Sequence, residues 1–569
     1  MPIEALLRVA RGDCAADLLL TNAHIVNLSS SEIFPGSVAI HEGRFVGFGK
    51  YQADKTIDLQ GAYVAPGFID GHVHLESSLL APGEFARAVL PRGTTCVVAD
   101  PHEIVNVMGA EGLAYMLAET EHLPLEVYFM LPSCVPATHL ETAGATFGAE
   151  EMRSWIEHPR VLGIGELMNF PGVVHSDPEV LAKIALAGSR RIDGHAPLVM
   201  GRDLDAYTAA GITSDHETSR PDEAVAKLRR GMFLLMRDGS AARNLLDLLP
   251  IVTDQNARFI GFATDDRHPD FMVRHGHIDD MVRQAIAFGI DPVLALQMAS
   301  YNTADHYRLD HLGAIAPGRQ ADFVIIEDLE QLEVREVFKK GRRIARAGKL
   351  IEDIPAVRTN PGNSVRIQEP ADLDLAVPAR DSSVRVIDLV PHQILTEMRI
   401  VTPRIEHQRI VSDPAEDILK IVVVERHHAR PQTGIGFVHG FGLQKGALAT
   451  TVAHDSHNLI VIGVSDEDIR QAIAAVRELQ GGQLVLADGQ VRASLPLPIA
   501  GLMSTESLHV VNDATEALNR VAAELGCELP APFMSLSFLA LPVVPKLRIT
   551  DQGLVDVDEF RFVSLFAED

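Results

Sequence analysis

The sequence predicts an α/β protein in which a (β/α)8 barrel is flanked by a composite β domain and a C-terminal α/β domain. Three observations predict this fold class. Short apolar strands alternate with helical patterns between residues 66 and 310, similar β patterns lie on both sides of that stretch, and strand and helix patterns resume after a proline-rich segment. The 569 residues are enough for about two to four domains.

The segments on either side of the barrel both have the pattern of short strands. Alternating runs separated by Gly and Ser fill residues 17–65. Similar runs return at 318–326 and 334–338, after the barrel. We therefore predict one composite β domain, built from residues 1–65 plus 311–360, which the barrel interrupts.

Eight apolar segments are candidates for the barrel strands of a domain over residues 66–310. A barrel of this kind needs about 250 residues, which the stretch provides. Because such a barrel places its active site at the carboxyl ends of the strands, the residues that end them are the candidates for chemistry. The segments are 65–74, 94–100, 125–131, 161–166, 191–195, 212–216, 232–236 and 259–265.

The remainder of the chain predicts a separate C-terminal α/β domain over residues 375–569. Prolines recur between residues 355 and 380, as is typical of a linker. Beyond them, apolar runs predict strands, and a 3.6-residue apolar period predicts a helix with one buried face. The strands are expected at 421–425, 459–463 and 483–486, and the helix at 466–479.

Composition narrows the classes of partner. The net charge of -27 disfavours binding to nucleic acid or to anionic lipid. No stretch approaches the roughly 20 apolar residues of a membrane span, and residues 1–5 lack the basic start of a secretory signal, so we expect a cytoplasmic protein without membrane contact. The cysteines lack the C-x-x-C spacing of disulfide frameworks and thiolate zinc sites; they are Cys14, Cys96, Cys134 and Cys527.

Two histidines end the first predicted barrel strand. Alternate residues of a strand project to one face, so His72 and His74 point together beyond the strand end. Two neutral imidazoles that converge in this way suit a divalent metal ion. Such a pair also occurs as packing or surface residues, so the pair alone leaves both interpretations open.

Later strands end in residues of the same chemical types. Each such residue, taken singly, could cap a helix or bind a backbone group. Because the carboxyl ends of barrel strands meet at one face, their occurrence together favours a shared metal site. In chain order they are Glu166, His195, His216 and Asp265.

Longer motifs around these residues resemble the adenine deaminase family of the amidohydrolase superfamily. The resemblance covers essentially the whole chain, and Glu166 stands where many superfamily members have a carboxylated lysine. The matching segments are Gly-His-Val-His-Leu-Glu-Ser-Ser at 71–78, Gly-Glu-Leu-Met-Asn-Phe at 165–170, Asp-Gly-His-Ala-Pro at 193–197, Ser-Asp-His-Glu at 214–217 and Thr-Asp-Asp-Arg at 264–267.

The resemblance implies a metal-dependent hydrolase with two divalent ions, Mn or Fe, and with Zn as an alternative that the absence of thiolate ligands does not favour. A metal pair about 3.5 to 4 Å apart can hold a bridging hydroxide at neutral pH. The implied ligands are His72, His74 and Asp265 for one ion and His195 and His216 for the other, with Glu166 as the bridge.

The same resemblance implies that the bridging hydroxide deaminates adenine to hypoxanthine and ammonia, in purine salvage, and that the enzyme is a homo-oligomer such as a dimer. Asp265 would take the proton of the hydroxide and serve the leaving ammonia, while Glu217 would transfer a proton to the ring. Glu217 could instead be only an acid in the first turn of a helix. Asp100, which ends the second strand, is a candidate for contact with the substrate or with Glu217.

A second polar cluster, His454-Asp455-Ser456-His457-Asn458, precedes an apolar strand of the C-terminal domain. One interpretation is a solvated turn. Another is a loop that covers the barrel mouth, where it excludes water or binds the substrate. A third is an additional metal site built from His454, Asp455 and His457, and the sequence does not choose among the three.

Two other functions remain open. The same fold and metals could act on another aminopurine or on a cyclic amide, as hydantoinases and dihydroorotases do, but a carboxylated lysine is common in that group and Glu166 counts against it. A non-catalytic interaction protein could also use this scaffold. Because all six ligand positions hold a suitable residue, the sequence argues against that alternative.

Overall fold

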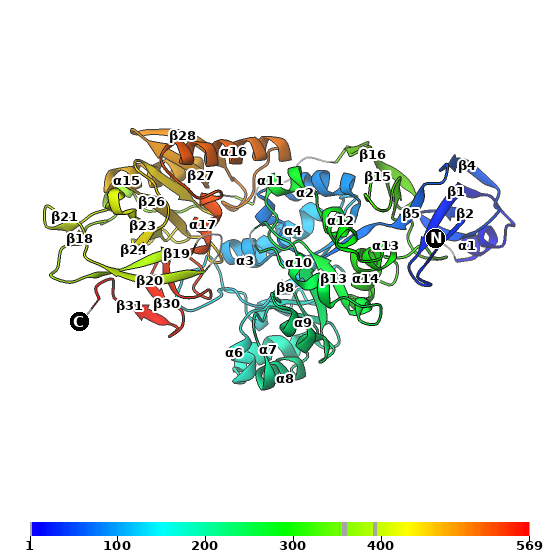
Figure 1. The fold of residues 1–569 in the computed structure, drawn as a ribbon, viewed down its shortest axis with the longest axis horizontal. Coiled ribbons are helices and arrows are strands. Elements are labelled where there is room, and N and C mark those ends of the chain that lie inside the picture. The colour runs from blue at the N-terminus through cyan, green and yellow to red at the C-terminus, as the bar shows by residue number, and fades with distance from the viewer. Residues whose placement is uncertain are drawn as a thin grey trace.

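The chain forms three parts that follow one another along the long axis of the molecule (Figure 1). At one end lies a sheet near the N-terminus, in the centre a group of strands and helices, and at the other end the C-terminal part. This computed structural model describes residues 3–240, 242–351, 353–354, 361–362, 364–390 and 395–567. Within those residues, the search for a helix long and apolar enough to cross a membrane finds none.

The eight predicted barrel strands form two parallel sheets in the centre, in the orders β10-β9-β8-β7-β6 and β11-β12-β13. Hydrogen bonds join the two sheets at both edges. The N–H of Asp265 donates to His72 O at 3.0 Å, and the N–H of Thr213 donates to Ile192 O at 2.9 Å. The strands are β6 Phe68–Val73, β7 Thr94–Ala99, β8 Glu126–Pro132, β9 Val161–Leu167, β10 Arg191–Gly194, β11 Ser214–Asp215, β12 Phe233–Arg237 and β13 Ile260–Ala263.

These strands form because their apolar residues are covered on both faces, as in other parallel sheets. Every residue of β6, β7, β12 and β13 is buried. Gly71 allows a close approach inside β6, since a Cβ there would lie 2.4 Å from Leu235 Cδ2. The longer helices along this part of the chain are α2 Pro82–Val89, α3 His102–Met108, α4 Ala110–Thr120, α7 Pro178–Ala187, α8 Gly201–Ala209, α9 Pro221–Leu228, α11 Pro269–Arg274 and α12 Ile278–Phe288.

A nine-stranded sheet combines segments from before and after the central strands. The two segments meet where β14 pairs antiparallel with β5, so that Val324 lies opposite Ala65. Helix α1 Ile3–Ala10 packs beside β3. The strands are β1 Ala16–Asn27, β2 Glu32–His41, β3 Arg44–Phe48, β4 Ala53–Asp58, β5 Tyr63–Pro66, β14 Phe323–Ile326, β15 Val334–Lys339, β16 Arg342–Arg346 and β17 Lys349–Leu350.

The C-terminal part is built on an eight-stranded sheet in the order β20-β19-β24-β23-β26-β25-β27-β28. Helix α15 Asp466–Leu479 begins at Ser465, whose side chain accepts a hydrogen bond from the N–H of Asp468, and it matches the predicted helix. The strands are β19 Val384–Leu389, β20 Thr396–Val401, β23 Ile418–Val424, β24 Thr433–His439, β25 Ala447–Thr450, β26 Leu459–Gly463, β27 Gly482–Ala487 and β28 Gln490–Pro496; helices α16 Leu508–Glu524 and α17 Pro532–Phe538 follow.

The predicted linker differs from what the structure shows. Residues 355–360 lie outside the described residues. From residue 364 onward the segment packs with the C-terminal sheet, because Val365, Ile367, Leu373 and Leu375 are buried in a core shared with β23, β25 and β26. The prediction of a linker is therefore wrong for residues 364–375, because the apolar residues between the prolines pack into the C-terminal core.

The C-terminal part is attached to the central strands close to their carboxyl ends. The N–H of Ser504 donates to Leu79 O at 2.8 Å, and the N–H of Ala81 donates to Ser504 O at 2.9 Å. Leu80 and Leu502 belong to one continuous hydrophobic core. This attachment brings a loop of the C-terminal part close to the residues that end the central strands.

Candidate metal centre

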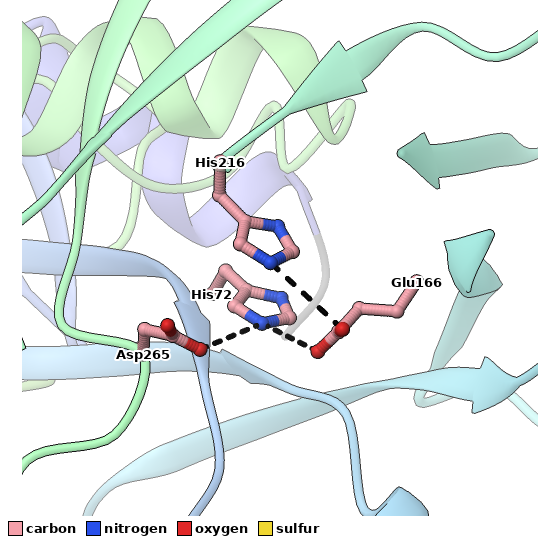
Figure 2. Close-up of side chains that lie close together, drawn as sticks. All are labelled: His72, Glu166, His216 and Asp265. Carbon is pink, nitrogen blue, oxygen red and sulfur yellow. Dashed lines mark ion pairs between the residues drawn. The ribbon is translucent and has the colours of Figure 1, made fainter. Parts of the chain in front are cut away.

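The imidazole and carboxylate side chains that end the central strands converge on one place. Figure 2 shows four of them, His72, Glu166, His216 and Asp265, pointing toward one another from different strands. Their ligand atoms all lie within 4.8 Å of one another, and all four side chains are buried. Strand-end position, the feature used to select them in the sequence, is thus what brings them together.

One group of donors surrounds the first carboxylate oxygen of Glu166. Nε2 of His72 lies 2.9 Å and Nε2 of His74 lies 2.7 Å from Glu166 Oε1. The same two nitrogens lie 3.5 and 3.2 Å from Oδ1 of Asp265. Two imidazoles and two carboxylates at these separations suit a divalent cation.

A second group faces the other oxygen of Glu166. Nδ1 of His195 lies 3.1 Å from Glu166 Oε2, and Nε2 of His216 lies 3.9 Å from it. Because Oε1 is shared with one pair of histidines and Oε2 with the other, Glu166 lies between the two groups. This is the position that a bridging ligand would need.

The hydrogen bonds of these side chains leave ligand atoms available. Nδ1 of His74 bonds the carbonyl oxygen of Asp100 at 2.8 Å, so its proton is held there and Nε2 can bind a metal. Among the described residues, neither ring nitrogen of His216 has a hydrogen-bond partner, and neither has Nδ1 of His195. Buried polar atoms without partners are costly, and divalent cations at these two groups would satisfy them. The residues present therefore fit divalent metal ions.

The buried carboxylates of the centre also favour a positive charge beside them. Burial opposes a charge on His72, but the negative charge of Glu166 and a hydrogen bond to Asp265 outweigh it and raise the pKa of His72 to about 10. Burial likewise opposes ionisation of Glu166, yet the charges of His74 and His72 hold its pKa well below the usual range. Metal binding to histidine and carboxylate ligands releases protons, so a divalent ion would take the place of a proton on His72.

Two of the carboxylates are held by unusual backbone. Glu166 has φ of 24° and Asp265 has φ of 54°, in the left-handed region that side-chain-bearing residues rarely adopt. Such conformations persist where the surrounding structure determines them, and they cluster at functional sites. Here they turn each carboxylate inward just as its strand ends.

Glu217 lies beside this centre and has a partner that the sequence reasoning missed. Its Oε1 is 3.7 Å from His195 Nδ1. Arg237 forms an ion pair with Glu217, its Nη2 donating to Oε2 at 3.0 Å, and its Nη1 donates to Asp265 Oδ2 at 2.8 Å. Arg237 ends β12, so its position at the carboxyl end of a strand is a sequence signal for the site. Its residue type is not a metal ligand, and selection by ligand type therefore excludes it.

Asp100 lies on the Glu166 side of the centre. Its Oδ1 accepts a hydrogen bond from the N–H of His102 at 3.2 Å, and a Cβ on Gly165 would lie 2.3 Å from its Oδ2. Burial, followed by the charge of Glu166, raises the pKa of Asp100 well above its usual range. Among the described contacts Asp100 has none with Glu217, and contact with the substrate, the other role predicted for it, stays a prediction.

The 454–458 cluster of the C-terminal part is buried against the barrel, so its interpretation as a solvated turn is wrong. Nδ1 of His454 lies 3.0 Å from Oε1 of Glu103, and Nε2 of His457 contacts Oε2 of the same carboxylate. Glu103 belongs to α3, directly after β7 and Asp100. The loop and the centre are therefore neighbours, although residue order alone gave no sign of this contact.

Two observations bear on the third interpretation, an additional metal site: the ligand atoms of Glu103, His454 and His457 lie within 4.8 Å of one another, and Nδ1 of His457 accepts a hydrogen bond. The N–H of Ala453 donates to Nδ1 of His457 at 3.1 Å, so the imidazole proton is on Nε2, the atom that faces Glu103. Burial lowers the pKa of His457, which favours this neutral form. The cluster of Glu103, His454 and His457 joins the C-terminal part to α3, and the additional metal site stays a prediction.

A buried lysine ties together the loops that carry His195 and His216. Nζ of Lys227, in α9, lies 2.8 Å from Asp215 Oδ2, 2.7 Å from Glu223 Oε1 and 2.8 Å from the carbonyl oxygen of Ala196. Asp215 precedes His216 and Ala196 follows His195. Lys227 therefore connects both histidine-bearing loops to one helix.

Comparison with known proteins agrees with the motifs. Residues 63–344 match the model of the amidohydrolase family, and residues 393–561 match the adenine deaminase C-terminal domain. The chain is 49% identical to adenine deaminase 2 of Carboxydothermus hydrogenoformans over 99% of each chain, and 48% identical to adenine deaminase of Desulfatibacillum aliphaticivorans, again over 99% of each. It is also 47% identical to adenine deaminase of Methanothrix thermoacetophila over 100% of both chains. The chain therefore belongs to the adenine deaminase family of the amidohydrolase superfamily.

Proposed function

We propose that this protein catalyses the hydrolysis of adenine to hypoxanthine and ammonia. The observation that carries the proposal is the centre itself: Glu166 lies between two pairs of histidines, beside Asp265 and Glu217, in a chain that matches adenine deaminases over its full length. A ring carbon that loses an amino group must gain an oxygen from water. The reaction also needs one proton on the ring nitrogen next to that carbon and one on the amino nitrogen that leaves as ammonia. The residues around the centre supply these functions.

Two divalent ions would be held here, one by His72, His74 and Asp265 and the other by His195 and His216, with Glu166 between them. Imidazole and carboxylate donors without thiolate suit Mn or Fe, and Zn is the alternative. When bound, such ions lower the pKa of water enough to supply a nucleophile at neutral pH. The remaining chemistry belongs to the side chains.

Asp265 and Glu217 would move the protons. Asp265 would accept the proton of the attacking water through Oδ2, the oxygen that also accepts a hydrogen bond from Arg237. It would later deliver a proton to the departing ammonia. Glu217 would deliver a proton to the ring nitrogen next to the attacked carbon. Arg237 contacts both carboxylates, so it would fix their positions relative to each other during these transfers.

The molecular setting of this activity is part of the proposal. The eight central strands would act as the (β/α)8 barrel of residues 66–310. The composite β domain of residues 1–65 and 311–360 and the C-terminal domain of residues 375–569 would be separate domains. The enzyme would work in the cytoplasm in purine salvage, as a homo-oligomer such as a dimer. The net charge of -27 supports a partner that is neither nucleic acid nor anionic lipid.

The test is a direct assay. Purified protein loaded with Mn is incubated with adenine, and hypoxanthine and ammonia are quantified together, since the reaction forms them in equal amounts. We expect both products at equal rates. No turnover of adenine, together with turnover of a cyclic amide such as dihydroorotate, would replace the proposal with its amide-hydrolase alternative.

A further inference from the structure

Buried polar atoms without hydrogen-bond partners extend beyond the metal centre toward the C-terminal part. Among the described residues, Nδ1 of His102 and Oδ2 of Asp455 both lack a hydrogen-bond partner. Both residues are buried, with 5% and 4% of their surface exposed. Such groups are expensive to leave unsatisfied. Nδ1 of His102 faces Glu166 of the centre, whereas Oδ2 of Asp455 lies on the other side of the ring and indicates a polar ligand there.

The two residues lie next to the centre. Nδ1 of His102 is 3.7 Å from Oε1 of Glu166, and Nε2 on the other edge of the same ring is 3.9 Å from Oδ1 of Asp455. One imidazole ring therefore separates Asp455 from the carboxylate between the histidine pairs. A molecule that reacts at the centre and extends by one further ring would reach both residues.

The loop that carries Asp455 is firmly attached to the barrel. Glu103, the residue after His102, pairs with His454 and His457 on either side of Asp455. Asn458 adds a hydrogen bond from its Nδ2 to the carbonyl oxygen of Thr142 at 2.8 Å. Asp455 is thus a fixed carboxylate that the C-terminal part supplies to the barrel, which is the kind of preorganised group that gives a site its specificity.

We propose that Asp455 and His102 recognise the five-membered ring of adenine, and thereby select the free base. Asp455 accepts the ring N–H, and His102 donates from Nε2, the nitrogen on the Asp455 side, to the neighbouring ring nitrogen that carries no proton. A nucleoside has a glycosidic bond in place of that N–H, so it would bring an unpaired carboxylate into contact with a sugar. The inference rests on the proposed function, because it assigns the part of adenine remote from the reacting carbon.

The first experiment uses the wild-type holoenzyme with adenine and with 9-methyladenine, which lacks a ring N–H. We expect kcat/KM for 9-methyladenine to be at least about 100-fold lower than for adenine, because a site that binds an N–H discriminates strongly against an analogue without it. Equal turnover of the two compounds would overturn the inference and leave adenine deamination intact. Absence of adenine turnover would instead overturn the proposed function, and this inference with it.

The second experiment compares Asp455→Asn with Asp551→Asn. Asp551 is another buried carboxylate of the C-terminal part; it accepts hydrogen bonds from the N–H of Thr142 at 2.9 Å and from Nδ2 of Asn458 at 3.3 Å, so its variant controls for a change that only loosens the loop. We expect Asp455→Asn to raise KM for adenine by roughly 10- to 100-fold, the loss of one hydrogen bond to a charged group, and to leave 9-methyladenine turnover and metal content unchanged. Asp551→Asn should retain the wild-type preference.

Three outcomes of the second experiment would contradict the role of Asp455. A loss of metal from Asp455→Asn would make it a metal ligand, an equal loss for both substrates would make it a structural residue, and an adenine KM within threefold of wild type would exclude contact with the ring. If Asp455→Asn does not fold, the wild-type comparison of adenine with 9-methyladenine still decides the inference.

Discussion

At the scale of single residues, the centre depends on which atom of each side chain is free. His74 and His457 are both buried imidazoles near carboxylates, but they differ in the partner of Nδ1. In His74 that atom bonds a carbonyl oxygen, and Nε2 is free to bind a metal. In His457 it accepts an N–H, and Nε2 carries the proton. Residue type and position could be predicted from the sequence; the direction of these hydrogen bonds could not, because it depends on local backbone.

Glu217→Gln tests the proton transfer assigned to Glu217. The substitution preserves size but removes a group that can exchange a proton, so we expect turnover of adenine to fall at least about 100-fold while bound metal per chain stays the same. Steady-state kinetics and metal analysis measure the two effects. Asp222→Asn, at an exposed carboxylate of α9, is the control and should match wild type. Turnover of Glu217→Gln within threefold of wild type would remove Glu217 from the mechanism.

The buried carboxylate of Glu141 is expected to make the stability of the protein depend on pH. Burial, followed by the charge of Asp455, raises the pKa of Glu141 from 4.5 to about 8. Between these two values the folded protein holds a proton that the unfolded chain has released, so the contribution of Glu141 to stability is full below pH 4.5 and is lost as pH rises through 8. Glu141→Gln stays neutral, and its thermal midpoint relative to wild type should therefore be higher at pH 9 than at pH 5.

The matched control for this pH effect is Glu150→Gln, because Glu150 is an exposed carboxylate. Its midpoint relative to wild type should be independent of pH. A difference between Glu141→Gln and wild type that is equal at pH 5 and pH 9 would show that Glu141 titrates alike in the folded and unfolded chains.

At the scale of elements, strand ends and their supporting helices determine where the donors lie. The strands and their polar ends were predictable because apolar runs and a parallel sheet fix which residues meet. Arg237 followed the same rule and was missed only because its residue type is not a metal donor. The supporting role of Lys227 had no sequence signal, since a lysine in a helix is ordinarily exposed.

Lys227→Met tests this support. The change leaves Asp215 and Glu223 as buried carboxylates without their cation, so we expect a loss of about 3–5 kcal/mol in stability, measured by urea unfolding. Lys445→Met is the matched control: Lys445 pairs with Asp488 at the surface and should contribute about 0–1 kcal/mol. Equal unfolding midpoints for the two variants would show that the buried lysine is not needed to hold the histidine-bearing loops.

At the scale of the whole molecule, distant segments complete the neighbourhood of the centre. The composite sheet was predictable, because similar β patterns on both sides of the barrel needed partners, and β5 and β14 provide the pairing. The contact between Glu103 and the 454–457 loop could not be predicted. The apolar periodicity of a sequence indicates whether a segment is a helix or a strand, but not which distant segment it contacts. The same limit applies to the residues after 364, whose apolar side chains find their place only in the folded C-terminal core.

The central claim is that one site, with Glu166 between two groups of ligands, holds two ions that are both needed for deamination. The most direct measurement is a titration of metal-free protein with Mn, in which adenine turnover is plotted against bound metal per chain. The account predicts that turnover rises until two ions are bound per chain and then stays constant, and that Glu166→Ala does not reach two. Full turnover with one ion per chain, or two tightly bound ions in Glu166→Ala, would contradict it.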